Sequence, residues 1–505
     1  PQLSGAAPRE GVSYDCNVEF SHHMQVTRIH ESPRVTRPYT EEQWAEVLAL
    51  GAAVDRELQA GDVRLTMGGE PTFVAVENRD AAEWNTDALG PTKRGYATEL
   101  VDRLRAEYGS GGFLHFGQGK WYPGEQLPRW ALSIYWRADG QPCWRDPTLF
   151  ADERVPARYT TEDAERFIHR LAAHLGVGDR FVQPAYEDVF YYLWRERRLP
   201  VNVDPFDSRL DDELERARLR RVFEQKLGSV VGYALPLQVR EDAPRLAGPH
   251  WQTGPWFLRD DRLYLVPGDS PMGYRLPLDA LPWVHARDYP HLVPRDPFEP
   301  HAPLPVPAQL RFPSGDPRFP ERGADAAAAS AESGRGHGEP GPSHEHSPDT
   351  RRPARHESAS WVARTALCVE VRDPQRANGP KAEREHGGRS GVLYVFMPPL
   401  ARVEDYLELL AAVEQTAAEL GVKIVLEGYP PPRDARLKLL QVTPDPGVIE
   451  VNIHPAHDWN ELVHNTEFLY DAAFRSRLSA EKFMTDGRHT GTGGGNHFVL
   501  GGATP

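Results

Sequence analysis

The chain has 505 residues, enough for about two to four domains, and 40% of them are hydrophobic, which is ample for burying cores. Its net charge of −15 at pH 7 argues against a nucleic-acid partner, because neutralising phosphates requires a basic face. Three widely spaced cysteines favour a cytoplasmic location, and no apolar run approaches the roughly 18 residues that a membrane span requires.

Residues 1–40 are predicted to be a connector with little periodicity. Cys16 lies near two histidines, but sequence proximity alone does not make a catalytic triad, and we do not expect it to be a nucleophile. The chain begins with Pro rather than Met, which favours a piece of a longer protein. From Thr40, with Gln43 three positions later, a capping box predicts the start of an amphipathic helix.

In the next segment, DVRLTMGGEPTFV, Glu70 follows two glycines and precedes Pro71. This segment predicts a strand. The following run, PTKRGYATELVDRLRAEY, predicts a basic turn that opens a helix. Lys93 and Arg94 at its head are candidates for binding phosphate, because helix N-termini favour anions, or are simply solvated.

An aromatic loop, FGQGKWYPGEQLPRW, carries polar residues that favour a ligand pocket, with Glu125 as a candidate metal ligand. Residues 160–240 are predicted to be mostly helical. In the loop PGDSPMGYRLP, Asp269 and Arg275 are candidates for binding a substrate carboxylate, or for a structural ion pair.

Residues 315–358 are rich in Ala, Gly, Ser, Pro, Glu and His, a composition typical of disorder. We therefore predict one α+β catalytic domain split in sequence, with residues 41–314 as its first part and 359–505 as its second. The second part opens with a buried type of strand and a helix closed by Gly421.

Two motifs near the C-terminus carry the most chemistry. Ile449, Val451 and Ile453 alternate with Glu450 and Asn452, which predicts a strand with both polar residues on one face. Some forty residues later, a Gly-rich loop leads into a short apolar run. Its backbone amides are candidates for closing on phosphate oxygens, at Gly493, Gly494, Gly495 and Asn496, and His497 follows them.

Together with the Glu70 segment they make three motifs. The Glu70 segment is the first, the Glu450 strand the second, and the Gly-rich loop with His497 the third. In this order they resemble the motifs of the glutamine synthetase-like carboxylate–amine ligases. The longer stretches LTMGGEPTFV, VPGDSPMGYRLPL, EGYPPPRDARL and EVNIHPAHDWNE resemble the family of putative amidoligases that are often fused to an N-terminal transglutaminase-like domain. The resemblance covers nearly the whole chain apart from the tract near 315–360. It implies an α+β fold with a glutamine synthetase-like antiparallel sheet, packed helices and the disordered insert.

The resemblance also implies a reaction, the ATP-dependent formation of an amide from a small-molecule or peptide carboxylate and an amine. Glu70 and Glu450 would hold Mg²⁺ or Mn²⁺, and His497 would lie against the metal or the γ-phosphate. Arg433 and Arg436 are candidates to offset charge on the transferred phosphoryl group. Thr72 departs from the superfamily pattern, which has a second Glu there, and the chain ends before a further Arg-containing segment, so we expect an incomplete piece.

Two alternatives stay open. His454 and His457, with Asp458 beside them, have a spacing that suits zinc, although the sequence supplies no convincing third ligand for a zinc-dependent hydrolase. The other alternative is a non-catalytic nucleotide- or peptide-binding module that keeps the fold without turnover.

Overall fold

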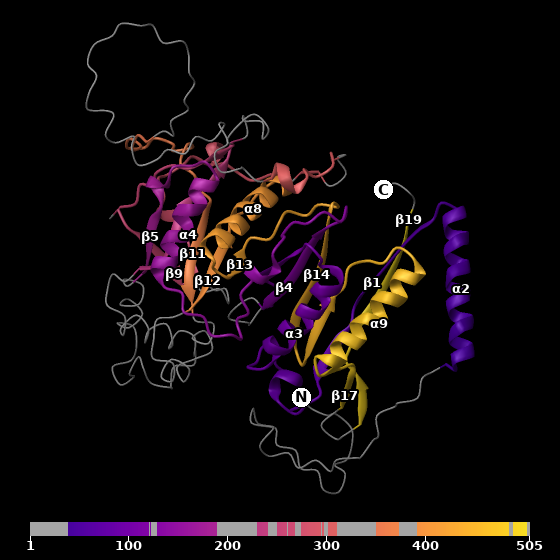
Figure 1. Ribbon diagram of the computed structural model, residues 1–505. Coiled ribbons are helices and arrows are strands. Elements are labelled where there is room, and N and C mark those ends of the chain that lie inside the picture. Colours follow the sequence, from indigo (N-terminus) through magenta and orange to yellow (C-terminus); the bar gives the residue numbers. More distant parts are fainter. Residues whose placement is uncertain are drawn as a thin grey trace, which may run out of the picture. The chain divides into compact units, whose positions relative to one another are not determined.

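The computed structural model describes residues 39–120, 122, 129–188, 230–240, 250–259, 261–267, 274–293, 295–296, 301–310, 350–372, 391–483 and 488–501. The chain divides into two compact units, each described by itself below. Unit 1 comprises residues 1–108, 131–133 and 439–505, and unit 2 comprises residues 109–130 and 134–438. Both mix helices with strands (Figure 1), which confirms the α+β class, and no sheet in the described ranges closes into a barrel.

Unit 1 is built on a sheet whose strands follow the order β16-β2-β15-β14, next to residues 131–133 of β4 (Trp130–Arg137). The strand pairs β14–β15, β15–β2 and β2–β16 are antiparallel. The helices and strands of this unit are α2 (Glu41–Ala60), β1 (Arg64–Glu70), β2 (Thr72–Ala75), η1 (Ala82–Trp84), α3 (Lys93–Tyr108), β14 (Leu437–Asp445), β15 (Val448–Asn452), α9 (Trp459–Arg475), β16 (Leu478–Ser479), β17 (Glu481–Phe483), β18 (His489–Gly491) and β19 (Gly495–Gly501).

Helix α9 covers one face of this sheet. Phe73 of β2 meets Tyr470 of α9 edge to face, with ring centroids 5.3 Å apart. Ile449 lies directly across from Phe73 on β15, so it shares this face, and it is fully buried. Because side chains alternate along a strand, Thr72 and Glu450 point to the opposite face. The predicted strand at Glu450 is confirmed, and so is the capping box of Thr40 and Gln43 at the start of α2.

Unit 2 contains a seven-stranded sheet in the order β10-β9-β5-β6-β11-β12-β13. It is mixed rather than purely antiparallel, because β12 and β13 are parallel and are joined by α8, and β5 and β9 are also parallel. The main elements of unit 2 as a whole are β3 (Phe113–Gln118), β4 (Trp130–Arg137), α4 (Thr161–His174), β5 (Gln183–Glu187), β6 (Val230–Pro236), β7 (Gln238–Val239), β8 (Trp251–Gln252), β9 (Leu263–Pro267), β10 (Tyr274–Arg275), β11 (Ala366–Arg372), β12 (Val392–Met397), α8 (Val403–Leu420) and β13 (Ile424–Gly428).

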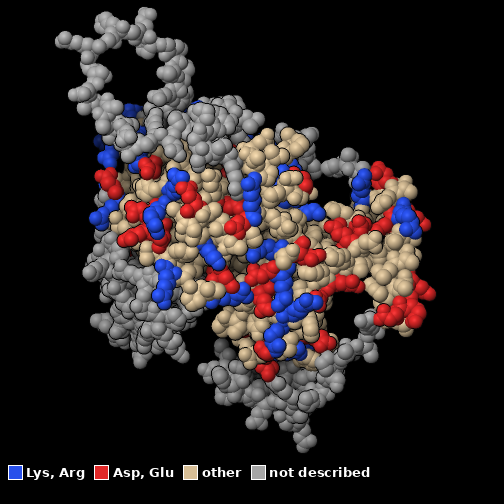
Figure 2. Space-filling model, in the orientation of Figure 1, with Lys and Arg blue, Asp and Glu red and all other residues tan. Residues whose placement is uncertain are grey.

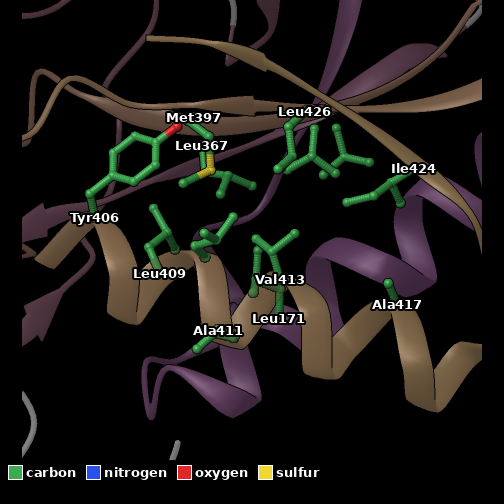
Figure 3. Packing of buried hydrophobic residues seen from close by; sticks show 14 of the residues in the cluster. Leu171, Leu367, Met397, Tyr406, Leu409, Ala411, Val413, Ala417, Ile424 and Leu426 are labelled. Carbon is green, nitrogen blue, oxygen red and sulfur yellow. The ribbon is translucent and has the colours of Figure 1, made fainter. Parts of the chain in front are cut away.

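The core of unit 2 lies between its sheet and the helices α4 and α8. Figure 3 shows Leu409 and Val413 of α8 pointing toward the strands that carry Leu367 and Leu426. Leu367 and Val369 of β11 face these helices, whereas Ala366 and Cys368 belong to a second cluster on the other face. The predicted helix closed by Gly421 is confirmed, with that residue in the left-handed conformation at φ 64°.

Two predicted segments differ from the structure. Within 160–240, α4 is helical, but β5 and β6 are strands, because their apolar residues pair into the sheet rather than lining a helix face; residues 189–229 lie outside the described part. Of the predicted linker, 315–349 lies outside the described residues, but 350–358 has defined contacts. There Arg351 forms a bidentate ion pair with Glu357, at 2.7 and 2.8 Å, and the Ser358 hydroxyl accepts a hydrogen bond from the His285 amide.

Charges are mixed over the surface that Figure 2 shows, where described Lys and Arg residues are interspersed with Asp and Glu. Among the described helices, none combines the length and the apolar character needed to cross a membrane.

Candidate functional site

The backbone register of β15 brings the first and second motifs together. Glu450 lies directly across from Thr72, and the Val451 amide donates to the Pro71 carbonyl at 2.9 Å. The Ile453 amide donates to the Gly69 carbonyl at 3.3 Å, so the same register continues past Pro71 and sets Asn452 opposite Glu70. Residues that lie directly opposite in antiparallel strands share a face. Glu70, Thr72, Glu450 and Asn452 therefore lie on the face that α9 leaves uncovered.

Strand β19 adds the third motif on the other side of β1. In this antiparallel pair, Gly495 lies opposite Glu70 and His497 lies opposite Gly68. A Cβ atom built on Gly495 would meet Nε2 of His497 at 3.6 Å, so the imidazole leans back over Gly495 toward the position of Glu70. The register thus brings Glu70, Glu450 and His497 to one face of unit 1, although 427 positions separate the outermost pair.

Two of the groups that contact the Glu450 carboxylate are neutral donors. The Glu450 side chain is 5% exposed, and Oε1 accepts hydrogen bonds from Nδ2 of Asn452 at 2.9 Å and from Oγ1 of Thr443 at 3.5 Å. Thr443 lies directly across from Glu450 on β14, so it approaches from the other neighbouring strand. A buried carboxylate requires such donors, because an unsatisfied buried charge is costly. Asn452 and Thr443 are therefore orienting groups for this carboxylate.

The remaining groups of this face differ in their surroundings. Glu70 is half-buried and His497 is exposed on β19. Thr72 is 6% exposed, and its hydroxyl has no hydrogen-bond partner within the described part of the chain. Further along the face, Nε2 of Gln441 donates to the Ser133 hydroxyl at 2.9 Å. We call the set Glu70, Thr72, Thr443, Glu450, Asn452 and His497 the polar face.

The glycines of the third motif make close contacts with the first motif. A Cβ atom on Gly494 would come within 2.9 Å of both the Glu70 carbonyl oxygen and the Thr72 amide nitrogen. These are backbone atoms that cannot move aside, so only glycine fits there. Gly493 has a φ of 92°, in the left-handed region that favours glycine. These two glycines thus allow the loop before β19 to pack against Pro71, and the phosphate-binding role of the loop stays a prediction.

The prediction that Lys93 binds phosphate is not supported by its contacts. Its side chain is fully buried, and Nζ donates to the carbonyl oxygens of Asp87, Ala88 and Asp445 at 2.9 to 3.0 Å. The anion-binding position at the start of α3 is also taken. There the Glu83 carboxylate accepts from the amides of Thr92 and Lys93, at 3.1 and 3.0 Å. The chain itself supplies the anion that the helix N-terminus favours.

The two arginines predicted to act on the phosphoryl group belong to unit 2. Arg436 is committed to structural contacts: Nε and Nη2 contact the Asp434 carboxylate at 2.8 and 2.6 Å, and Nη1 contacts Glu404 at 2.9 Å. These ion pairs raise the pKa of Arg436 further and lower that of Asp434. Arg433 is exposed, and in unit 1 Arg94 is half-buried at the head of α3.

Three predictions fall on parts that the structure does not describe. Glu125, Asp269 and Cys16 lie outside the described residues, and Arg275 is placed on β10 without a described side chain.

The zinc alternative gains no support from unit 1. His454 is buried, stacks edge to face on Tyr108 with ring centroids 4.7 Å apart, and has Asn465 at 3.4 Å from Nε2. His457 is exposed, and Asp458 caps α9 by accepting from the Glu461 amide at 2.8 Å. No group of three or more His, Cys, Asp or Glu side chains able to hold a metal occurs among the residues searched, which are the described ones.

Sequence reasoning did not single out Thr443, Gln441 or Ser133. A signal was present for the first two, since they alternate with the buried Leu440 and Val442 along β14. Their pairing with β15 was not visible, because register between strands depends on tertiary contacts.

The fold is of the α+β class. Its polar face places two carboxylates beside hydroxyl and amide groups on one side of a sheet. The chain belongs to the family described as putative amidoligase enzyme (DUF2126), whose model matches residues 14–505. This confirms the family resemblance and indicates a ligase enzyme in general terms. No curated protein and no solved structure matches the chain.

Proposed function

We propose that the chain is an ATP-dependent carboxylate–amine ligase that forms an amide through an acyl phosphate. The observation that carries this proposal is the shared sheet face of Glu70, Glu450 and His497, which come from three strands far apart in the sequence. The family description supports the ligase class. ATP dependence and the acyl phosphate belong to the proposal.

The chemistry explains why such a face would be required. A carboxylate does not react with an amine at neutral pH until one of its oxygens becomes a leaving group, which phosphorylation by ATP provides. Mg²⁺ or Mn²⁺, when bound, would neutralise charge on the β- and γ-phosphates. The donor set fits such a hard cation, because Glu70 and Glu450 offer carboxylate oxygens and Thr72 adds a buried hydroxyl that lacks a partner among the described residues.

The chain's own residues would perform the positioning. Asn452 and Thr443 hold the Glu450 carboxylate in one orientation through their hydrogen bonds to Oε1. Gly494 fixes the third motif against the first, and the exposed imidazole of His497 can approach the γ-phosphate from β19. Pre-set groups of this kind lower a barrier because little reorganisation is left to the reaction itself.

The finer predictions belong to the same proposal. The substrates would be a small-molecule or peptide carboxylate and an amine, on a glutamine synthetase-like fold with a transglutaminase-like domain fused upstream. A cytoplasmic location fits the free, buried thiols of Cys143 and Cys368.

The test is a calorimetric titration of ATP into wild type, Glu450→Gln and Glu467→Gln, each with and without Mg²⁺. Glu450→Gln keeps the shape of the side chain and its acceptor oxygen but removes the charge. We expect its affinity for ATP with Mg²⁺ to fall at least about tenfold, or roughly 1.4 kcal/mol, with little change for ATP alone. Glu467 is an exposed carboxylate on α9, so Glu467→Gln is the matched control.

Equal affinity for ATP with Mg²⁺ in all three proteins would contradict the proposal. So would a wild-type chain that does not bind ATP with Mg²⁺.

A further inference from the structure

Strand β19 of unit 1 has one open edge in the described part of the chain. Among the described strands it pairs only with β1 (Figure 1), and their seven residue pairs run without a shift in register. An open edge presents backbone N–H and C=O groups that a further strand can bind, and proteins usually protect it with Lys, Pro or a bulge. The segment Gly495–Gly501 has neither Lys nor Pro, and its register with β1 shows no bulge. It is therefore an unprotected edge.

The hydrogen bonds of β1 determine which backbone groups of β19 point to the open edge. Met67 exchanges two backbone hydrogen bonds with Ala456, at 2.9 and 2.6 Å, so its N–H and C=O point away from β19. This direction alternates along an antiparallel strand, so Gly68 points toward β19, where His497 lies opposite. On β19 the same alternation turns outward the N–H and C=O groups of three residues, Asn496, Phe498 and Leu500.

The side chains along this edge are apolar and exposed on both faces of the strand. Three consecutive residues are exposed, Phe498 by 74%, Val499 by 62% and Leu500 by 59%. Because successive side chains of a strand point to opposite faces, Val499 lies on the face of His497 and the other two lie on the opposite face. A single exposed apolar side chain is ordinary, whereas a contiguous exposed patch marks a surface for docking.

The size and charge of this surface favour a peptide over a second folded protein or a second copy of the chain. A stable interface between two proteins buries about 800 Å² on each partner. An aromatic side chain buries only about 150–250 Å², so three side chains of one strand fall well short of that area. Between Gly495 and Gly501 there is no Asp, Glu, Lys or Arg to bind a charged partner. An extended peptide meets these conditions, because its affinity comes mainly from backbone hydrogen bonds to the open edge.

Resting on the proposed function, we propose that one substrate of the ligase is a peptide that binds in extended conformation as a further strand on β19. Its backbone pairs with the outward N–H and C=O groups of β19, and its apolar side chains pack beside Phe498 and Leu500. Residues directly opposite in paired strands share a face, so the peptide residue opposite His497 directs its side chain to the polar face. The strand that carries His497 thereby aligns the peptide with the candidate site.

The experiment measures binding of the fluorescein-labelled peptide Lys-Val-Thr-Val-Thr-Val-Lys to the full chain by fluorescence anisotropy. We expect saturable binding to wild type. Phe498→Ser should weaken it at least about tenfold, because the peptide loses its largest apolar neighbour. Phe474→Ser is the matched control: it removes a ring that is 76% exposed on α9 of the same unit and should bind within about twofold of wild type. An analogue of the peptide with every amide N-methylated keeps the side chains and charges but donates no hydrogen bond, and it should bind at least about tenfold more weakly.

Four results would overturn the inference: no peptide binding to wild type, equal affinity in wild type and Phe498→Ser, equal affinity for the N-methylated analogue, or a wild-type dimer in sedimentation velocity that Phe498→Ser dissociates. The last result would assign the edge to a second copy of the chain. Because Phe498 is exposed, Phe498→Ser should melt at the same temperature as wild type and bind ATP with Mg²⁺ equally well. The titration of ATP therefore tests the ligase proposal separately, since peptide binding can fail while ATP binding is retained.

Discussion

Buried polar groups occur in both units, and the groups that surround them differ. In unit 2, the fully buried His250 lies between Asp405 and Glu408, with ring nitrogens 3.4 and 3.5 Å from their carboxylate oxygens. The Trp251 indole donates to Glu408 at 2.8 Å as well. Both carboxylates thus have close neighbours from the same unit, and for Glu408 one of these neighbours is a hydrogen-bond donor.

On the polar face of unit 1, two side chains form no hydrogen bond or ion pair within the described part of the chain. Among the residues that the structure describes, the buried Thr72 hydroxyl lacks a hydrogen-bond partner, and no hydrogen bond or ion pair of the Glu70 carboxylate occurs. Lys93, in the same unit, shows that burial is not the distinguishing feature, since its ammonium group is buried and satisfied by three carbonyl oxygens. The polar face is distinguished by a combination, because its unpaired buried hydroxyl shares one sheet face with two carboxylates.

The largest expected effect sharpens this comparison by removing a buried group that is fully paired. Lys93→Met should destabilise the chain by about 3–5 kcal/mol, because three carbonyl oxygens lose a charged donor in a buried position. Urea denaturation measures the loss. Arg56→Met, at an exposed position on α2, is the control and should cost less than about 1 kcal/mol.

If Lys93 bound phosphate instead, Lys93→Met would weaken ATP binding and leave the free energy of unfolding nearly unchanged. That pattern would break the distinction between paired and unpaired buried groups.

A second prediction concerns the packing that assembles the polar face. Gly494→Ala should cost up to about 3 kcal/mol and weaken nucleotide binding, because the new methyl group would press on the backbone of Glu70 and Thr72. Gly491→Ala is the matched control on β18, since a Cβ there meets nothing within 4 Å. Thermal melts with and without ATP and Mg²⁺ compare the two variants. Equal behaviour would mean that the loop does not pack on the first motif.

The smallest effect is a pH dependence in unit 2. Burial lowers the pKa of His115 to about 4, against an ordinary value near 6.5, although backbone groups at Glu427–Tyr429 partly oppose this. Between these values the unfolded chain takes up a proton and the folded chain does not. The contribution of His115 to stability is therefore complete above about pH 6.5 and is lost as the pH falls.

At pH 5 the free energy of unfolding is expected to be about 2 kcal/mol lower than above pH 6.5 on account of His115. His115→Gln should remove that part of the slope between pH 7 and 5, as measured by urea denaturation, whereas His291→Gln, at an exposed position, should keep it. Identical slopes in wild type and His115→Gln would show that His115 gains its proton in the folded state as easily as in the unfolded one.

Some of the site was open to prediction from the sequence because its causes are local. The alternation around Glu450 and Asn452 follows from the two-residue period of a strand, so their common face required no tertiary information. The same holds for the capping box at Thr40 and for Gly421 at the end of α8, which depend on neighbours three or four residues away. The family resemblance rested on motif wording and order, and the family match confirms it.

The tertiary structure decided the rest. Glu70 and His497 share a face with Glu450 only because of the two neighbours of β1. On one side β1 hydrogen-bonds to the end of β15 and the residues after it, and on the other side it pairs with β19. Lys93 looked available at a helix head until Glu83 and three carbonyl oxygens took the positions around it. Such partners come from strands and loops up to some four hundred positions away, so no local pattern encodes them. Whether a polar side chain is used by the fold or left for a ligand depends on these distant partners, and that distinction separates Thr72 from Lys93.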